Sequence, residues 1–359
     1  MFRKHLLRAA AGWRPNAARL LAACVLGVGP AVADGPIRLR VVGGLAGITQ
    51  YNSFEEPFWS KEIRERSGGL IEATIQPIDR SGLRGQDALQ LMQLGVVPFG
   101  TANLALSAAD DPELAAIDLP GLAPDFAALR RAAGLYRPTL KAILGERYGI
   151  ELLGVYAYPA QVVYCAKPFR ELADLDGRRV RTSSVGQSSF VEALGATPVL
   201  IPFAETVGAV SKNVVDCAIT GTLSGFEIGL SNVTSHVHAL AVNWGLTLFA
   251  ANKRAWDALP ADARTIIGQG VSDLERRIWD AAERETARGI ACNTGAQLCG
   301  EAARGRMALV PVSARDDEER RRVLVERVLP AWAARCGEGC RQTWNRTLGS
   351  ALGVALGKP

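Results

Sequence analysis

The chain alternates short apolar strands with helices, and it does so in two successive runs. In the first run, apolar patterning predicts strands over residues 38–42, 70–76, 96–104 and 150–156, with helices over 52–67, 86–94 and 125–147, the last broken at Pro138. In the second, strands are predicted over 161–165, 179–182, 199–201, 217–219 and 246–251, with helices over 187–194 and 205–212. Strand–helix–strand order of this kind favours parallel sheets covered by helices.

A long helix is predicted after the second run. Pro260 begins it, and apolar residues recur at helical spacing from Ile266 to Ile278. A further helix is expected from Ser313, which forms a capping-box pattern with Asp316. Two α/β units that cross over near residue 158 and return near 244 predict a bilobed periplasmic binding protein fold. In such a fold, two α/β domains linked by a long helix enclose a ligand cleft at the carboxyl ends of the strands.

The first 33 residues have the pattern of a secretory signal peptide. Five basic and no acidic residues precede or flank an apolar run from Leu20 to Val28, and a small-x-small site ends at Ala33, where we expect cleavage. The apolar run is shorter than the roughly 20 residues that a membrane anchor needs. The alternative interpretation is a lipoprotein box ending at Cys24. Either interpretation predicts an exported protein, and we expect a periplasmic one.

The charge of the chain lies largely in this leader. The net charge is +5, and the leader carries five positive charges and no negative ones, so the remaining chain is neutral. No basic patch remains that would indicate nucleic-acid binding. The remaining length is sufficient for two domains, which we place at residues 37–159 with 246–288 and at 160–245 with 289–359.

Six cysteines follow the leader. An even number in an exported chain predicts disulfides. Six cysteines allow 15 pairings, and proximity along the chain suggests Cys292–Cys299 and Cys336–Cys340, which leaves Cys165 with Cys217. A zinc or redox site at Cys336-Gly-Glu-Gly-Cys340 is the alternative, although no histidine lies near it.

Combinations of catalytic residues are scarce. Outside the leader the chain has two histidines, His236 and His238, which could bind a metal from one strand face but have no evident third ligand, so packing roles are favoured. No G-x-S-x-G elbow, P-loop or dinucleotide fingerprint is present. We therefore expect a binding protein without cofactor or metal, not an enzyme.

Arg181 is the residue whose chemistry best fits recognition. It follows a Leu-Asp-Gly turn at the end of a predicted strand, and a guanidinium there offers a planar fork for a carboxylate. Taken alone, the position favours an ordinary surface arginine, so a binding role needs a second argument.

A family resemblance favours the binding role of Arg181. The segment Phe169-Arg-Glu-Leu-Ala-Asp-Leu-Asp-Gly-Arg-Arg-Val-Arg181 resembles the Asp-Leu-Lys-Gly-Leu-Lys-Ile-Arg signature of tripartite ATP-independent periplasmic (TRAP) transporter binding proteins of the DctP-like family. Four more family-like segments follow in order: Leu194-Gly-Ala-Thr-Pro-Val199, Phe203-Ala-Glu205, Asn213-Val-Val-Asp216 and Trp256-Asp-Ala-Leu-Pro260. The resemblance extends from about residue 38 to 290, which is most of the chain.

The resemblance implies a receptor that delivers its solute to a membrane permease driven by an ion gradient, without ATP. It also implies that Arg181 pairs with the carboxylate of an organic acid. A hinged two-domain fold with a long helix across both lobes belongs to the same expectation.

Further ligand contacts follow from the resemblance, residue by residue. Phe203 matches an aromatic that packs on the ligand, and polar contacts are implied for Asn103, Ser184 and Thr220. Trp244, at the lobe return, is expected to wall the pocket, and Arg84 to contact a second acidic group. Core packing is the alternative for Phe203 and Trp244, whereas simple exposure is the favoured interpretation of Arg84.

The sequence departs from its relatives at informative positions. Gln161, which we also expect to contact the ligand, stands where some members have a second arginine, which weakens any claim for sialic acid, and Cys217 stands where glycine is common. We therefore predict a monomeric receptor for a small organic carboxylate that works with the permease subunits of a TRAP transporter. The alternatives are a receptor of an ATP-driven importer or, in another class, a periplasmic enzyme on a two-lobed scaffold.

Overall fold

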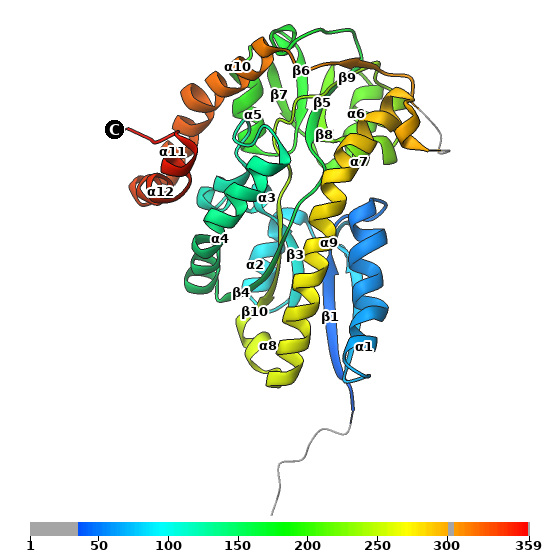
Figure 1. The fold of residues 1–359 in the computed structure, drawn as a ribbon, viewed down its shortest axis with the longest axis vertical. Coiled ribbons are helices and arrows are strands. Elements are labelled where there is room, and N and C mark those ends of the chain that lie inside the picture. The colour runs from blue at the N-terminus through cyan, green and yellow to red at the C-terminus, as the bar shows by residue number, and fades with distance from the viewer. Residues whose placement is uncertain (1–34, 301–304, 358–359) are drawn as a thin grey trace, which may run out of the picture. The chain divides into compact units, whose positions relative to one another are not determined.

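A computed structural model describes residues 35–300 and 305–357. The expected signal peptide and Cys24 lie outside these residues. The described strands form two sheets, one of five strands in the order β2-β1-β3-β10-β4 and one of six in the order β11-β9-β5-β8-β6-β7 (Figure 1). Their bounds are β1 Ile37–Gly43, β2 Ile71–Pro77, β3 Phe99–Asn103, β4 Ile150–Tyr156, β5 Gln161–Cys165, β6 Arg179–Thr182, β7 Thr197–Leu200, β8 Cys217–Gly221, β9 His236–His238, β10 Thr247–Asn252 and β11 Ala308–Val310.

Helices cover both sheets and continue beyond them to the end of the described chain. Their bounds are α1 Ile63–Arg66, α2 Ala88–Gln93, α3 Leu104–Ser107, α4 Phe126–Tyr148, α5 Val185–Glu192, α6 Thr206–Ser211, α7 Thr222–Glu227, α8 Lys253–Asp257, α9 Ala261–Thr294, α10 Ala314–Val323, α11 Leu329–Cys336, α12 Glu338–Trp344 and α13 Ser350–Leu352. Two wide helical segments, Gln50–Glu55 and Phe58–Glu62, precede α1 and complete the helix predicted over 52–67. The α/β architecture with two sheets confirms the predicted fold class.

The predicted strands are all present, within a few residues, but the sheets are not purely parallel. Strand β1 pairs in parallel with β2 and β3, as the strand–helix–strand order predicts. Strand β10 is antiparallel to both β3 and β4, and β5 is antiparallel to β8 and β9. Since β10 and β5 are the strands on which the chain returns or crosses over, they enter their sheets from the opposite end, and the sheets are mixed.

The break predicted at Pro138 is wrong, because α4 runs without interruption from Phe126 to Tyr148. A proline inside a helix removes one hydrogen bond and costs about 3 kcal/mol. The face of α4 that includes Tyr136 and Leu140 is buried on both sides of Pro138. Burial of this stripe offsets the cost, since a fully buried side chain contributes about 1.5–3 kcal/mol.

Helix α9 lies along both sheets, as the long helix in Figure 1 shows. Its N-terminal part packs on the first sheet, where Ile267 and Val271 join a buried cluster with Trp59 and Phe249. The rings of Trp59 and Phe249 stack with centroids 5.0 Å apart. Its C-terminal part packs against α7, which follows strand β8 of the second sheet. The predicted long helix across both units is confirmed.

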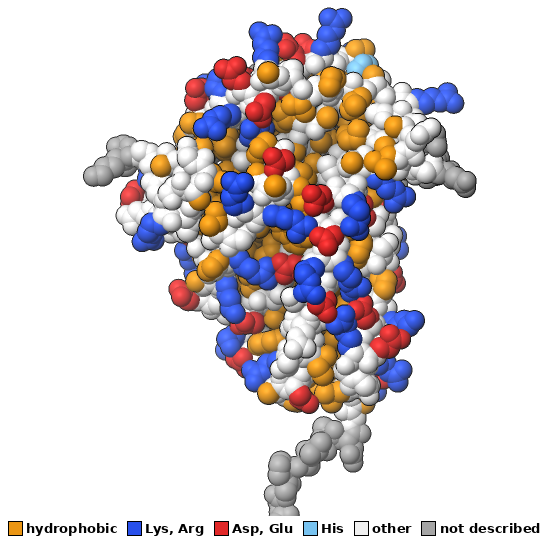
Figure 2. Space-filling view, in the orientation of Figure 1, with side chains coloured by type: hydrophobic (Ala, Val, Ile, Leu, Met, Phe, Trp, Pro, Cys, Tyr) orange, Lys and Arg blue, Asp and Glu red, His pale blue; other side chains and the backbone are white. Residues whose placement is uncertain are grey.

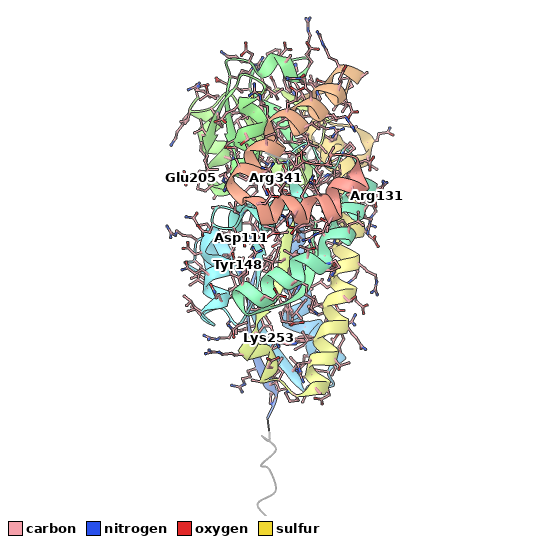
Figure 3. All side chains as sticks on the ribbon, turned by 90° about the vertical axis from the view of Figure 1, so that its left-hand side faces the viewer. Asp111, Arg131, Tyr148, Glu205, Lys253 and Arg341 are labelled. Atoms are coloured by element: carbon pink, nitrogen blue, oxygen red, sulfur yellow. A yellow bond between two sulfur atoms is a disulfide. The ribbon has the colours of Figure 1, made fainter. Side chains whose placement is uncertain are left out.

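The C-terminal helices begin as predicted and then extend to the elements beside the first sheet. Ser313 and Asp316 form the predicted capping box at the start of α10. Farther along, Trp332 Nε1 donates to the carbonyl of Pro112, at 2.6 Å. In Figure 3 the helices marked by Arg341 accordingly lie above Asp111 and Tyr148. The proposed domain boundaries stay a prediction, and these contacts add a connection that they did not include.

The three disulfides pair as predicted. Cys165–Cys217 joins two neighbouring strands, β5 and β8, at residues that face each other in register, while Cys292–Cys299 and Cys336–Cys340 close short loops. All six cysteines are thus occupied, and the alternative zinc or redox site at Cys336 and Cys340 is not supported. Among the described residues, no helix combines the length and hydrophobicity that crossing a bilayer requires. Figure 2 shows acidic and basic side chains interspersed over the face that carries α9.

Candidate functional site

A cavity of about 480 Å³ lies where strands of the two sheets end. Its volume falls within the range of roughly 300–1,000 Å³ that is usual for small-molecule sites. Asn103 ends β3, Arg181 and Thr220 lie near the carboxyl ends of the parallel strands β6 and β8, and Gln161 begins the antiparallel β5 at the same edge. This is the position at which α/β folds place their ligands.

Arg181 is a buried cation in the wall of this cavity. The residue is 2 % exposed. Nε donates to the carbonyl of Ile201 at 2.9 Å, and Nη1 donates to the carbonyl of Ile219 at 2.7 Å. A guanidinium has five N–H groups, so three remain for another partner. Two main-chain carbonyls therefore hold the group in place without neutralising it.

The environment of Arg181 is electrostatically suited to a negatively charged partner. Burial lowers its pKa to about 10, and no carboxylate in the described part of the chain opposes this shift. Isolated buried charges are strongly disfavoured unless they are paired. A cavity beside such a cation is suited to an anion, and a carboxylate matches the fork of the guanidinium.

Five of the eight predicted ligand contacts line the same cavity: Asn103, Gln161, Arg181, Phe203 and Thr220. The side-chain oxygen of Asn103 caps α3 by accepting from the amide of Leu106 at 3.0 Å. Gln161 donates through Nε2 to the carbonyl of Pro159 at 3.1 Å. Thr220 is 2 % exposed. These residues thus come together from both sheets, although their contact with a ligand stays a prediction.

The other three predicted contacts lie outside the lining of the cavity. Ser184 caps α5 by accepting from the amide of Gln187 at 3.2 Å, and its neighbour Ser183 lines the cavity instead. Arg84 is exposed and forms an ion pair with Asp87 at 2.7 Å. Both side chains are engaged in local interactions at helix starts.

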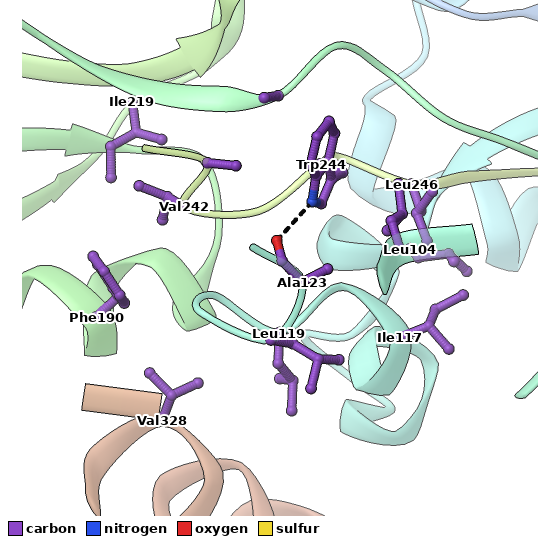
Figure 4. Close-up of a cluster of buried hydrophobic side chains, with 14 of the residues drawn as sticks. Leu104, Ile117, Leu119, Ala123, Phe190, Ile219, Val242, Trp244, Leu246 and Val328 are labelled. Atoms are coloured by element: carbon purple, nitrogen blue, oxygen red, sulfur yellow. Dashed lines mark hydrogen bonds between the residues drawn. The ribbon is translucent and has the colours of Figure 1, made fainter. Parts of the chain in front are cut away.

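Trp244 is a core residue in this structure. It is 3 % exposed, and its Nε1 donates to the carbonyl of Ala123 at 3.0 Å (Figure 4). Its ring meets that of Phe126 edge-on. The neighbouring residues Asn243 and Gly245 line the cavity. The lobe return therefore does contribute to the cavity, through the residues on either side of the tryptophan.

A buried polar network that the sequence did not indicate joins α5 to the return segment at the wall of the cavity. Gln187 on α5 donates to Asn243 at 2.9 Å, and Asn243 donates to Asp118 at 3.0 Å. Asp118 also accepts from the main-chain amides of residues 244, 245 and 246. Burial raises the pKa of Asp118 to about 6, and the four hydrogen bonds oppose this rise. The network fixes the return segment between β9 and β10.

The loop after β1 forms another part of the site and depends on glycine. A Cβ at Gly43 would lie 2.7 Å from the ring of Tyr51. The fully buried Glu55 accepts from the amide of Gly44 at 2.7 Å and from Gln50 Nε2 at 2.7 Å. Burial raises the pKa of Glu55. This packing fixes the start of the loop, and Leu45 and Ile48 farther along the same loop line the cavity.

The two histidines take structural roles. His238 is fully buried, and its Nδ1 accepts from the amide of Leu240 at 3.0 Å while its Nε2 lies 3.4 Å from Asp316. His236 shares a hydrogen bond with Ser235. Among the described residues, no group of three potential ligands surrounds either ring.

A comparison with models of protein families shows to which family the chain belongs. The model of "Bacterial extracellular solute-binding protein, family 7", the DctP family, matches residues 47–294. The chain belongs to this family. Members of family 7 are the solute-binding proteins of TRAP transporters, and the resemblance inferred from the sequence is confirmed.

Individual relatives of this family 7 protein support the assignment. The C4-dicarboxylate-binding periplasmic protein DctP of Rhodobacter capsulatus is 25% identical over 235 residues, which are 64% of this chain and 70% of the relative. A Bordetella pertussis extracytoplasmic solute receptor binding pyroglutamic acid, DctP7, has a TM-score of 0.75 at 23% identity, over 86% of this chain and 98% of its own. A TRAP periplasmic solute-binding protein from Desulfovibrio salexigens, with bound orotic acid, has a TM-score of 0.76 at 18% identity, over 88% and 98%. At these identities, the solved structures show a shared fold.

A narrow crevice of this family 7 protein adjoins the main cavity, and both include Ile48, Tyr158 and Ser224 in their walls. Here Glu227 on α7 accepts a hydrogen bond from the hydroxyl of Thr49. Glu285 on α9 lies in the same crevice. Burial, followed by the negative charge of Glu227, raises the pKa of Glu285 to about 7.

This pair predicts a measurable dependence of stability on pH. The pKa of folded Glu285 exceeds its ordinary value of 4.5, so the free energy of unfolding falls as the pH rises from about 4.5 to about 7. Replacement by glutamine removes the repulsion, and we expect Glu285→Gln to stabilise the protein by about 1 kcal/mol at pH 8 and not at pH 4.5, after allowance for solvent screening. Thermal unfolding of both proteins at the two pH values measures the effect.

The matched control for this prediction is Glu283→Gln. Glu283 is an exposed residue two positions earlier on α9, outside the crevice and 3.6 Å from Arg130, and its replacement should change the free energy of unfolding by less than about 0.5 kcal/mol at either pH. A difference between Glu285→Gln and the parent that is the same at pH 4.5 and pH 8 would contradict the proposed repulsion.

Proposed function

We propose that this chain is a periplasmic receptor that binds a small organic carboxylate and delivers it to the permease subunits of a TRAP transporter. The observation that carries the proposal is Arg181, a buried guanidinium beside a cavity with three N–H groups to spare and no carboxylate partner in the described chain. Binding of an anion there would supply the charge that the fold itself lacks. Exclusion of water by the ligand and by closing lobes would strengthen the pair further.

The relatives support the carboxylate as ligand class. Among those described above are proteins named for C4-dicarboxylate, pyroglutamic acid and orotic acid. A TRAP protein from Rhodoferax ferrireducens was solved with malonate. The TeaA protein of Halomonas elongata, another relative, is named for binding ectoine. These ligands differ in shape, so the shared element that comes to this chain is the acid group.

Receptor function also fits what the cavity contains. Family members are solute-binding receptors, not enzymes. Of the residues that line the cavity, those with titratable side chains are Asp79, Tyr158 and Arg181, and Asp79 is exposed and accepts from the amide of Ala46 at 2.9 Å. Capture of an acid needs an anchoring cation and a hinge, and no proton transfer. We propose on this basis that the chain binds its ligand unchanged, as a monomer.

The proposal is tested by thermal unfolding of the protein from Asp34 onward with a panel of organic acids at millimolar concentration. We expect at least one acid to stabilise it, by about 2.7 kcal/mol at 100 times its dissociation constant. The acid should be recovered chemically unchanged after incubation. Native mass spectrometry of the purified protein identifies any ligand retained from expression. A retained ligand without an acid group, or turnover of the bound acid, would contradict the proposal.

A further inference from the structure

The cavity has apolar surface on two sides. Of the 24 residues that line it, eleven are apolar. They form two groups on opposite lobes: one includes Ile78, Leu83 and Leu106, beside the first sheet, and the other is the segment 200–204, after β7 of the second sheet. Leu200 is 63 % exposed although it is a large apolar residue. Apolar lining of this kind is usual in small-molecule sites.

Positive charge, in contrast, is confined to one point. Arg181 is the one cation among the described residues that line the cavity, and the one carboxylate there is Asp79. The two other positions that could have supplied a cation do not. Gln161 is neutral, and Arg84 lies outside the lining, paired with Asp87.

Three polar side chains of the cavity, those of Gln161, Gln187 and Asn243, are hydrogen-bonded to the protein itself. Gln187 uses its oxygen for Ser183 and its nitrogen for Asn243, and Asn243 donates to Asp118. Gln161 donates to a main-chain carbonyl. A second carboxylate on the ligand would therefore lose its hydration without meeting a cation, and Asp79 would repel it.

From this distribution we propose that the ligand is a monocarboxylate with an apolar body, held by Arg181 at its acid end and by the two apolar groups along its length. The inference rests on the proposed function and narrows it to one substrate class. Selectivity against dicarboxylates follows because the site offers a single counter-charge. A cavity of about 480 Å³ also accommodates a body larger than a three- or four-carbon chain.

Matched pairs of acids test the proposal by isothermal titration calorimetry at pH 7.5. Cyclohexanecarboxylate is compared with trans-cyclohexane-1,4-dicarboxylate, and 4-methylbenzoate with terephthalate; malonate, pyroglutamate and galacturonate represent hydrophilic acids. We expect each monoacid to bind at least roughly tenfold more tightly than its diacid, a difference of about 1.4 kcal/mol. Tighter binding of a diacid or a hydrophilic acid would overturn the substrate class and leave the proposed function standing. Binding of no acid would overturn both.

A pair of leucine variants tests the role of the apolar groups. Leu200→Gln should weaken binding of the better monoacid by roughly three- to tenfold, because it replaces apolar contact by a polar amide. Leu94→Gln is the matched control, since Leu94 is 68 % exposed and lies outside the cavity. Both substitutions are at exposed positions and should leave folding intact. Equal affinities of the two variants would overturn the proposed contact with Leu200.

Discussion

Replacement of Arg181 by lysine is expected to weaken binding of the physiological acid by about 1.5–3 kcal/mol, or roughly 10- to 150-fold. Lysine keeps the charge but offers a compact ammonium in place of the planar fork. The guanidinium spans the carbonyls of Ile201 and Ile219 while presenting further N–H groups to the cavity. An ammonium cannot satisfy both carbonyls and bind a carboxylate through two parallel hydrogen bonds. Calorimetric titration with the tightest acid of the panel measures the loss.

Arg179→Lys provides the control for this substitution. Arg179 lies two residues earlier on the same strand, and its exposed side chain pairs with Asp216 at 3.0 Å, outside the cavity. The same chemical change there should leave ligand affinity unchanged, because Arg179 does not line the cavity, and should alter stability by about 1 kcal/mol or less, as is usual for a surface ion pair. If Arg181→Lys binds the acid as tightly as the parent protein does, Arg181 is not the residue that anchors the carboxylate.

Removal of the Asp118 carboxylate is expected to lower the free energy of unfolding by at least about 3 kcal/mol, since each buried donor left without a partner costs about 1–3 kcal/mol. Asp118 is 4 % exposed and accepts from three consecutive main-chain amides and from Asn243. In Asp118→Ala, all four donors lose their partner. Urea denaturation at pH 7.5, followed by circular dichroism, measures the loss.

Asp110→Ala is the comparison for Asp118→Ala. Asp110 is exposed and has no hydrogen bond or ion pair within the described chain, so its truncation should change stability by less than about 0.5 kcal/mol. Similar stabilities of the two alanine variants would show that the network around the return segment does not stabilise the fold.

The regular elements could be predicted because they are local in sequence. Period-two and period-3.6 patterns located the nine strands that were predicted and the long helix α9, and the capping box at Ser313 marked the start of α10. The direction of β10 was not predictable in this way, because pairing direction depends on how a distant segment returns to the sheet. The uninterrupted α4 shows the same limit, since burial along the helix overrides the preference of Pro138.

The site was predictable where one residue carries the chemistry. The place of Arg181 in the cavity was indicated because a family-like segment ends at it, and the same resemblance indicated Asn103, Gln161, Phe203 and Thr220, which also line the cavity. The network of Asp118, Gln187 and Asn243 could not be found, because its members lie up to 125 residues apart and belong to no motif. Trp244 shows that position along the chain does not determine where a side chain points. The return segment does reach the cavity, but Asn243 and Gly245 line it and Trp244 does not.

The most direct test of the account compares an acid with its neutral isostere. The carboxylate that binds most tightly in the panel and its carboxamide have nearly the same shape. They differ in the negative charge with which Arg181 is proposed to pair. Calorimetric titration of the unmodified protein at pH 7.5 should show the amide binding at least roughly 100-fold more weakly, a difference of about 2.7 kcal/mol. Comparable affinities for acid and amide would mean that the cavity does not recognise a carboxylate, and would contradict the account.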